Sequence, residues 1–329
     1  MDARKVLEMG GGTLLISLPK AWVKKNGVRK GATVAVEELS GRKLLVRPIE
    51  DAEEKPREIE LEYPGEDFGH VANDLTSAYL LGYDLIRIVG KKVISREDRA
   101  MLKATMGHLV GLEIMDEDAK KITIQFLLEP SAIIPERIVR RMSSILGGML
   151  RDTAEGLTKG DSKLLGLVAE RDDEVDRLYF LLVRAIRAAI MRPEVAEGYG
   201  LSPVDVLDYR VLASFLESEG DAVAELSKDL RAARSSKELS RRYSSCVAKL
   251  EQMTDLATQA FLSRRASRLR TINAKVNGLA DEVTESLASI GQLPAAEGNH
   301  MVKILGTLER ASKLLVDVSD LAVITQPVS

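Results

Sequence analysis

Apolar residues recur about every 3.6 positions from Pro135 onward, and this period predicts long amphipathic helices over most of the chain. Prolines with nearby glycines interrupt the pattern and mark the helix ends. We expect six helices, which fall into two sets of three with similar lengths. The predicted helices span residues 135–159, 162–192, 203–232, 236–263, 265–290 and 297–325.

The first fifty residues have a different pattern, which predicts short strands around a glycine turn. Gly10-Gly11-Gly12 separates two apolar runs, and glycine readily adopts the positive φ angles that a tight turn needs. So few residues make a very small core, and we expect this unit to need a partner chain. The predicted strands are residues 6–7, 14–18, 33–38 and 44–47, with a short helix over 19–27.

The segment between these two regions begins with an acidic linker and then alternates between strand and helix patterns. It predicts a small βαβαβ unit, with strands over 59–63, 85–89 and 121–127 and helices over 68–81 and 96–110. The predicted fold class is mainly α, with two tandem three-helix bundles preceded by a small β-rich domain and a small α/β segment. We place the domains at residues 1–50, 51–130, 131–233 and 234–329.

The formal net charge of −3 conceals a basic N-terminal segment on an acidic body. Residues 1–49 hold ten Lys and Arg against four Asp and Glu, so this segment alone carries +6. Such a segment favours contact with nucleic acid, because lysine and arginine neutralise phosphates. A solvated helix face would carry the same residues, so both interpretations stay open. The candidate contacts around the predicted helix are Lys20, Lys24, Lys25, Arg29 and Lys30.

The remaining composition narrows the class of protein. A single cysteine, Cys246, excludes an intramolecular disulfide and a multi-cysteine metal site, which fits a reducing cytoplasm. We find no apolar run long enough to span a membrane and no signal-peptide core, and we expect a cytoplasmic protein. The three histidines lack the spacing of a helical metal pair, and no Ser-His-Asp arrangement is evident. We therefore expect no catalysis.

Two pairs of carboxylates on the first helical set are candidate metal ligands. Asp172 and Asp176 are four residues apart on one predicted helix, and Glu217 and Asp221 are four apart on the next. Residues at this spacing share a helix face, so two packed helices can present four oxygen donors to one cation. Mg²⁺, Ca²⁺ or Mn²⁺ accepts such a shell most readily, whereas Fe and Zn usually also recruit histidine. Gly220 would permit a close approach of the two helices.

Other interpretations of these acids stay open. A solvated face is common for such pairs, with Arg171, Arg177 or Arg210 as neighbouring cations. Asp173 with Glu170 or Glu174 is a competing pair on a different face of the same helix.

The second helical set aligns with the first but lacks its acids. In our alignment Asn273 and Asn277 replace Asp172 and Asp176, and Lys313 replaces Asp221. The ammonium group of Lys313 would then pair with Glu309 in place of a metal ion. A longer loop at 193–203 accounts for the different spacing of the two sets, and we expect a degenerate second bundle.

The motifs DxxVDxL and LExxGDxxxEL, at residues 172–178 and 216–226, resemble those of the PhoU family of phosphate-uptake regulators. The resemblance covers roughly residues 135–326. It implies an all-helical fold, metal clusters on the acidic motifs and a role in phosphate signalling without known catalysis. Asp172, Asp176, Glu217 and Asp221 match the ligand positions of the family. We expect them to bind a divalent or trivalent metal ion, one of Mg, Mn, Ca, Fe or Zn.

The N-terminal pattern of strand, glycine turn, strand ending in Leu18-Pro19, short helix and Lys30-Gly31 is similar to the AbrB/SpoVT swapped-hairpin DNA-binding domain. The resemblance implies an obligate homodimer that contacts DNA through basic residues of the first strand, the turn and the helix. At the turn this chain has Gly11, Gly12 and Thr13 where relatives often carry arginine. Arg4, Lys24 and Lys25 match the basic positions of strand and helix in the family. We expect Lys5, Lys20 and Arg29 to contact DNA as well.

Both domains in one chain suggest an archaeal, phosphate-responsive transcriptional regulator. The alternative is an adaptor that does not bind DNA, in which the N-terminal domain only dimerises and the helical body docks on a phosphate transporter or phosphate-signalling protein.

Overall fold

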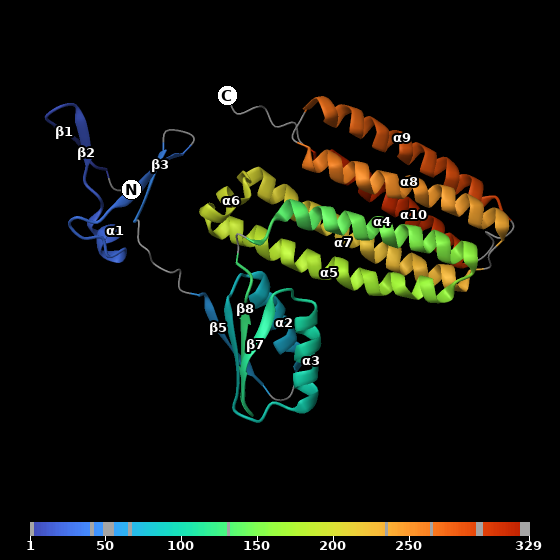
Figure 1. The fold of residues 1–329 in the computed structure, drawn as a ribbon, viewed down its shortest axis with the longest axis horizontal. Helices are drawn as coiled ribbons and strands as arrows, with labels where there is room; N and C mark the ends of the chain where they lie inside the picture. Colours follow the sequence, from blue (N-terminus) through green and yellow to red (C-terminus); the bar gives the residue numbers. More distant parts are fainter. Residues whose placement is uncertain are drawn as a thin grey trace. The chain divides into compact units, whose positions relative to one another are not determined.

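The chain forms two compact units in the computed structural model, residues 1–55 and 56–329 (Figure 1). We describe each unit by itself. The structure describes residues 3–39, 43–48, 56–64, 68–129, 132–233, 236–263, 266–293 and 299–322.

The first unit, called the head below, consists of two hairpins and a short helix. Strands β1 (Val6–Met9) and β2 (Thr13–Ile16) pair antiparallel, as do β3 (Val34–Leu39) and β4 (Lys43–Pro48), and α1 (Lys20–Lys25) lies between the hairpins in sequence. Gly11 and Gly12 have φ angles of 96° and 82°, which confirms the predicted glycine turn. The predicted strands and helix of this unit are therefore present.

No residue of the described part of the head is buried. Large apolar side chains on both hairpins are instead exposed, among them Leu7 at 62%, Leu14 at 67% and Leu44 at 67%. A single copy of the head therefore has no hydrophobic core of its own.

The second unit begins with an α/β segment. Its elements are β5 (Glu58–Tyr63), α2 (Phe68–Leu80), β6 (Leu85–Gly90), α3 (Arg96–Gly107), β7 (Leu112–Glu117) and β8 (Lys121–Phe126). The strand order is β5-β6-β8-β7, with β5 parallel to β6 and the other neighbours antiparallel. Ile86, Ile88, Ile122 and Ile124 are buried on one face of this sheet.

The α/β segment has one strand more than the predicted βαβαβ unit, because β7 was not predicted. Only Leu112 of β7 is buried, its C-terminal half is acidic, and its register shifts between Ile114 and Asp116. This edge strand therefore lacks the alternation of buried and exposed residues by which a strand is recognised in a sequence.

Seven helices follow: α4 (Pro135–Lys159), α5 (Ser162–Met191), α6 (Pro193–Tyr199), α7 (Pro203–Ala232), α8 (Lys237–Leu262), α9 (Ala266–Gly291) and α10 (Asn299–Asp320). Six of them correspond to the six predicted helices. The short helix α6 was not predicted, since we interpreted residues 193–203 as a loop. Pro193 begins α6 and Gly200, with a φ of 65°, ends it, so residues that usually punctuate loops here cap a two-turn helix.

The two sets of three helices pack side by side (Figure 1). Helices α4, α5 and α7 contact one another, as do α8, α9 and α10, while α4 packs on α8 and α7 on α10. Apolar residues on these helices are completely buried, for example Leu146, Leu182, Leu216, Leu250 and Leu308. The fold is thus mainly α, with two three-helix sets joined by a shared core. No helix of the described residues is both long and apolar enough to cross a membrane.

Arg184 of α5 attaches the α/β segment to the helices. Its side chain is buried and donates hydrogen bonds to the carbonyl oxygens of Tyr79 and Tyr83, at 2.5 and 3.1 Å. It also forms an ion pair with Asp84 at 3.1 Å. These contacts fix the C-terminal half of α5 to the end of α2.

Candidate functional site

The packing of α5 on α7 brings the four predicted carboxylates to one place. Oxygen atoms of Asp172, Asp176 and Asp221 lie within 4.8 Å of one another. Glu217 is close enough to the group that its charge raises the pKa of Asp172. Three of the four side chains are half-buried, and Asp221 is exposed. The structure thus brings three of the predicted carboxylates within reach of one ion, while Glu217 interacts with them through its charge but is not within that distance. We call Asp172, Asp176, Glu217 and Asp221 the acidic cluster.

Gly220 allows the two helices to approach at this point. A Cβ atom at Gly220 would lie 2.7 Å from Oδ1 of Asp172 and 3.3 Å from Cγ1 of Val175. The Asp172 Oδ1 atom is buried and has no hydrogen-bond partner among the described residues. An unpaired carboxylate oxygen inside a cluster of like charges is unfavourable unless it is protonated or bound to a cation.

The electrostatics of the acidic cluster favour a bound cation. The pKa of Asp172 is raised to about 7, first by burial and then by the charges of Asp176 and Asp221. The pKa of Asp176 is raised by burial and then by Asp221, and the pKa of Glu217 by burial and then by Asp221 and Asp176. Each carboxylate thus opposes the ionisation of its neighbours, and a cation would relieve this repulsion.

The arginines that could have neutralised the acidic cluster are engaged elsewhere. Arg171 pairs with Asp152 at 2.9 Å, and Arg210 donates hydrogen bonds to Ser214 and Tyr179. Within the described part of the chain no ion pair joins either of them, or Arg177, to the acidic cluster. Glu174 of the competing acidic pair contacts Arg141 at 3.5 Å.

Three of the predicted DNA-contacting residues lie together on the head. Lys20, Lys24 and Arg29 line one shallow hollow of ≈400 Å³ at α1 and the residues that follow it. Lys20 and Lys24 are one helical turn apart, so they share a face of α1. Arg4, Lys5 and Lys25 are exposed but do not line this hollow. We call Lys20, Lys24 and Arg29 the basic hollow.

Comparison with known proteins identifies the first helical set. The family model described as "PhoU domain" matches residues 139–230, which run from α4 to α7 and include the acidic cluster. Residues 139–230 form a PhoU domain. The model described as "Antidote-toxin recognition MazE, bacterial antitoxin" matches residues 9–54, so the head is a MazE/AbrB-like domain.

Among solved structures, PhoU from Pseudomonas aeruginosa matches with a TM-score of 0.39 at 14% sequence identity. The match covers 57% of this chain and 93% of that chain. The comparison with curated proteins gives no match.

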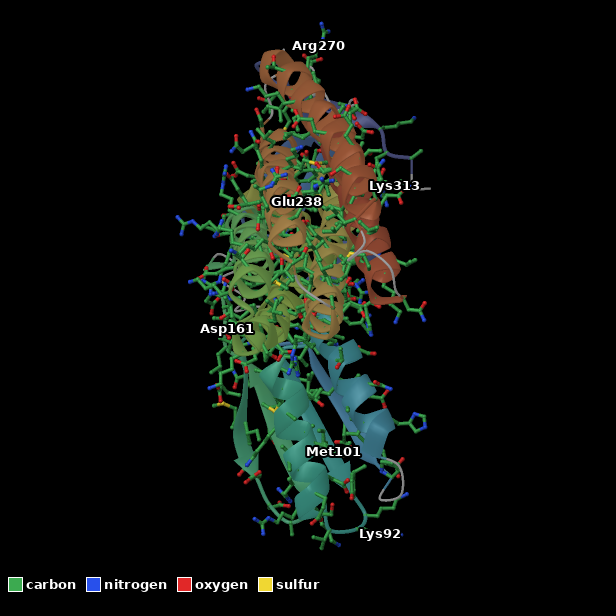
Figure 2. The ribbon with its side chains drawn as sticks, turned by 90° about the vertical axis from the view of Figure 1, so that its right-hand side faces the viewer. Lys92, Met101, Asp161, Glu238, Arg270 and Lys313 are labelled. Atoms are coloured by element: carbon green, nitrogen blue, oxygen red, sulfur yellow. The ribbon has the colours of Figure 1, made fainter. Side chains whose placement is uncertain are left out.

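Among the described residues, the helices that follow the PhoU domain carry no equivalent of its acidic cluster. Lys313 and Glu309, both on α10, form the predicted ion pair at 2.6 Å (Figure 2, where Lys313 is labelled). The residues that face this pair from α9 differ from our alignment, however. Ala280 and Thr284 line the same hollow as Glu309 and Lys313. Asn273 instead exchanges hydrogen bonds with Ser319, at 2.9 Å and 3.3 Å, and Asn277 donates to the carbonyl oxygen of Asn273.

The predicted alignment of α9 with α5 is therefore shifted by two helical turns. The segment Asp173-Glu174-Val175 of the PhoU domain corresponds in position to Asp281-Glu282-Val283, with Val175 and Val283 both buried. Asp172 and Asp176 are then replaced by Ala280 and Thr284. The sequence Asp-Glu-Val, present in both helices, supports this alignment. Our alignment from the sequence instead matches Asn273 and Asn277 with the acidic pair, because asparagine resembles aspartate more closely than alanine or threonine does.

The sequence also gave no indication of a cavity at the end of the helices. This cavity, of ≈630 Å³, is lined by residues between Glu129 and Leu321, and α6 forms part of its wall. Its residues are distributed over nearly 200 positions, and α6 itself was not predicted, so no local motif marks it.

Proposed function

We propose that this protein is a DNA-binding transcriptional regulator of phosphate uptake and phosphate homeostasis. The head binds DNA as a homodimer, and the helical body responds to the phosphate state as a metal-binding sensor or as a docking module for a phosphate transporter or signalling protein. The proposal involves no catalysis. The presence of a MazE/AbrB-like head and a PhoU domain in one chain supports this combination of roles.

The observation that carries DNA binding is the basic hollow. Three cations around one hollow can neutralise phosphates of one DNA segment, and each phosphate contact adds affinity that falls with salt. The segment that contains them has a net charge of +6, on a chain whose total charge is −3. DNA would therefore be attracted to the head and repelled by the acidic body.

The exposed apolar side chains of the head support a homodimer. Leu7, Leu14 and Leu44 are each more than 60% exposed, and the described head has no buried residue in a single copy. A second head that interleaves its hairpins with the first would bury these side chains. The dimer also doubles the number of basic hollows presented to DNA.

The acidic cluster supports metal binding by the body. Its donor set consists of carboxylate oxygens alone, it contains an unpaired buried oxygen, and Gly220 leaves room for Asp172. Asp172, Asp176, Glu217 and Asp221 would hold the ion, and Mg²⁺, Mn²⁺ or Ca²⁺ suits such donors best, with Fe or Zn also compatible with carboxylates. A bound cation would hold α5 and α7 together, because it replaces repulsion between the two carboxylate pairs by attraction.

A charge-reversal experiment tests the DNA-binding role. The full chain, its K20E/K24E variant and a K163E/K275E control with two equally exposed body lysines are titrated onto a fluorescent duplex from the gene's own upstream region. Light scattering of each variant measures the dimer. The proposal predicts at least a tenfold weaker binding for K20E/K24E, an intact dimer, and no change for the control.

The second candidate function is the adaptor that only dimerises through its head. The turn supports it, because Gly11, Gly12 and Thr13 offer no cationic side chain to DNA. If the wild type and K20E/K24E both form dimers and both bind DNA negligibly, the regulator function is rejected and the adaptor function is favoured. Binding of the body to a phosphate transporter would then become the next measurement.

A further inference from the structure

The cavity at the end of the helices is built from both helical sets. The start of α4, helix α6 and the first turns of α7 contribute from the PhoU domain side, and the last turn of α8 and Leu321, directly after α10, contribute from the other side. Its volume of ≈630 Å³ is within the range of pockets that bind small organic molecules. The cavity lies on a different part of α7 from the acidic cluster, since Tyr209 is two turns before Glu217.

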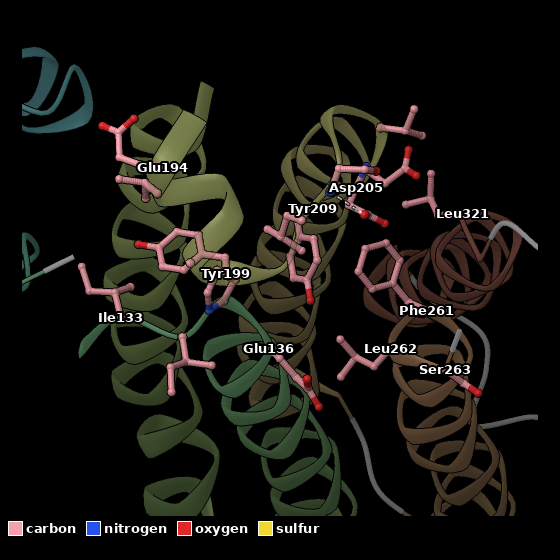
Figure 3. A pocket seen from close by; sticks show the side chains of 18 of the residues that line it. Ile133, Glu136, Glu194, Tyr199, Asp205, Tyr209, Phe261, Leu262, Ser263 and Leu321 are labelled. Carbon is pink, nitrogen blue, oxygen red and sulfur yellow. Dashed lines mark hydrogen bonds between the residues drawn. The ribbon is translucent and has the colours of Figure 1, made fainter. Parts of the chain in front are cut away.

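Aromatic side chains form the interior of this cavity (Figure 3). Tyr199 of α6, Tyr209 of α7 and Phe261 of α8 line it together with Ile133 and Leu262. The rings of Tyr209 and Phe261 lie edge to face, with their centres 5.0 Å apart and an angle of 85° between their planes. Aromatic faces attract cations through the quadrupole of the ring, in addition to providing apolar contact.

Every charged side chain among the lining residues is acidic. Glu136 already accepts two hydrogen bonds from Arg140, and Asp205 accepts one from the backbone of Ser202. Asp208 is half-buried and has no hydrogen bond or ion pair among the described residues, and burial followed by the charge of Asp205 raises its pKa. The acidic lining residues are Glu129, Glu136, Glu194, Asp205 and Asp208.

The charge balance of the cavity remains negative when neighbouring cations are counted. Arg264 and Arg265 follow the lining residue Ser263 in the sequence and lie outside the described residues. Arg192 is a further neighbouring cation, because its charge opposes the burial that raises the pKa of Tyr199. Together with Arg140 and Arg192 the two arginines supply four positive charges against five carboxylates. An anion such as phosphate is therefore disfavoured here, and a cation is favoured.

We propose that this cavity is a binding site for a small organic cation, an amine or guanidine attached to an apolar body. The apolar body would contact Tyr199, Tyr209 and Phe261, and the cationic group would pair with Asp208, whose carboxylate is the unpaired one nearest the aromatic residues in sequence. Because the walls come from both helical sets, the bound cation would stabilise their association. The site is separate from the DNA-binding and metal-binding roles proposed above.

The test uses two probes that share a phenylethyl body and carry charged groups of opposite sign. Calorimetric titration of the full chain compares 2-phenylethylammonium with 3-phenylpropionate, which has a similar aromatic body but an anionic group, in the presence of EDTA. We expect saturable binding of the ammonium probe with a Kd between about 10 µM and 1 mM, and no measurable binding of the carboxylate. Equal binding of both probes, or of neither, would overturn the proposal.

Two variants locate the binding within the cavity. Asp208→Asn removes the unpaired charge and should weaken the ammonium probe at least fivefold, and Phe261→Leu, which keeps most of the apolar volume, should weaken it at least threefold. Glu285→Gln, at an exposed carboxylate of α9, is the matched control and should bind like the wild type. Circular dichroism confirms that each variant is folded. Unchanged binding by D208N, or an equal loss in E285Q, would place the probe elsewhere and overturn the assignment.

Discussion

The guanidinium of Arg184 lies 3.7 Å from the centre of the Phe126 ring. A buried cation on a helix of the PhoU domain thus packs against an aromatic ring of the α/β segment. The same guanidinium lies 5.1 Å from the centre of the Tyr79 ring and donates a hydrogen bond to the carbonyl oxygen of Tyr79. Asp176, a member of the acidic cluster, is two turns earlier on the same helix. The α/β segment is therefore held by the helix that also carries half of the acidic cluster.

Replacing Arg184 should destabilise the second unit. Arg184→Met keeps an apolar side chain but removes the donor from the Tyr83 carbonyl oxygen and from Oδ1 of Asp84, and one of two donors from the Tyr79 carbonyl oxygen. We expect a loss of about 3 kcal/mol in the free energy of unfolding. Arg177→Met, at an exposed position of α5, should change it by less than about 0.5 kcal/mol. Urea denaturation of the two variants measures the difference. Equal stabilities would show that the buried cation contributes little to this contact.

Divalent metal should stabilise the protein through the acidic cluster. Mn²⁺ or Mg²⁺ is expected to raise the Tm of the wild type, because a cation offsets the burial and the charge repulsion that together raise the pKa of Asp172 to about 7. In the double variant D172N/D176N the Tm without metal should rise, since two mutually repelling charges are removed, and the response to metal should disappear. Thermal unfolding with EDTA and with each metal measures both effects. A metal response that survives in the double variant would contradict the assignment.

A glycine-to-alanine change should separate α5 from α7. Gly220→Ala places a methyl group 2.7 Å from the Asp172 carboxylate, and we expect a loss of about 2 kcal/mol in stability together with weaker metal binding. Gly166→Ala is the matched control on α5, because a Cβ atom there meets nothing within 4 Å and alanine favours the helix by about 0.5–1 kcal/mol. The two variants should thus change stability in opposite directions. If both variants changed the stability in the same direction, the close approach of α5 and α7 at Gly220 would be refuted.

The pH dependence of stability should report Glu219, a buried residue of α7. Burial raises its pKa from 4.5 to about 7, although the hydrogen bond donated by Thr254 opposes this rise. The folded state thus holds a proton that the unfolded state releases at lower pH, so stability is lost as the pH rises from about 4.5 to 7. Glu219→Gln keeps an acceptor for Thr254 and should be more stable than the wild type by about 2 kcal/mol at pH 8, with little difference near pH 4. Parallel curves for both proteins would exclude ionisation of Glu219 as the cause.

The sequence predicted those features that depend on residues near one another in the chain. The six long helices, the glycine turn of the head and the two i,i+4 acid pairs follow from local periodicity, and the PhoU and MazE/AbrB-like assignments follow from motifs on those elements. Strand β7 was missed because its burial pattern is that of an edge strand, and α6 because Pro193 and Gly200 are equally typical of loops.

Features that depend on packing were not predictable in the same way. The register of α9 against α10, which places Ala280 rather than Asn273 beside Lys313, depends on helix lengths that differ between the two sets. The cavity of Tyr199, Tyr209 and Phe261 and the buried contact of Arg184 with Phe126 join residues from separate elements. No spacing within one helix indicates either.

The salt dependence of DNA binding tests the central claim most directly. If two heads of a homodimer each present Lys20, Lys24 and Arg29 to phosphates, about six phosphates are neutralised, and the logarithm of the binding constant should fall with the logarithm of the salt concentration with a slope of about −5. Fluorescence anisotropy titrations of the full chain on its upstream DNA at several salt concentrations give this slope. A slope near −5 that becomes shallower in K20E/K24E would support a DNA-binding regulator, whereas a slope near zero would contradict it.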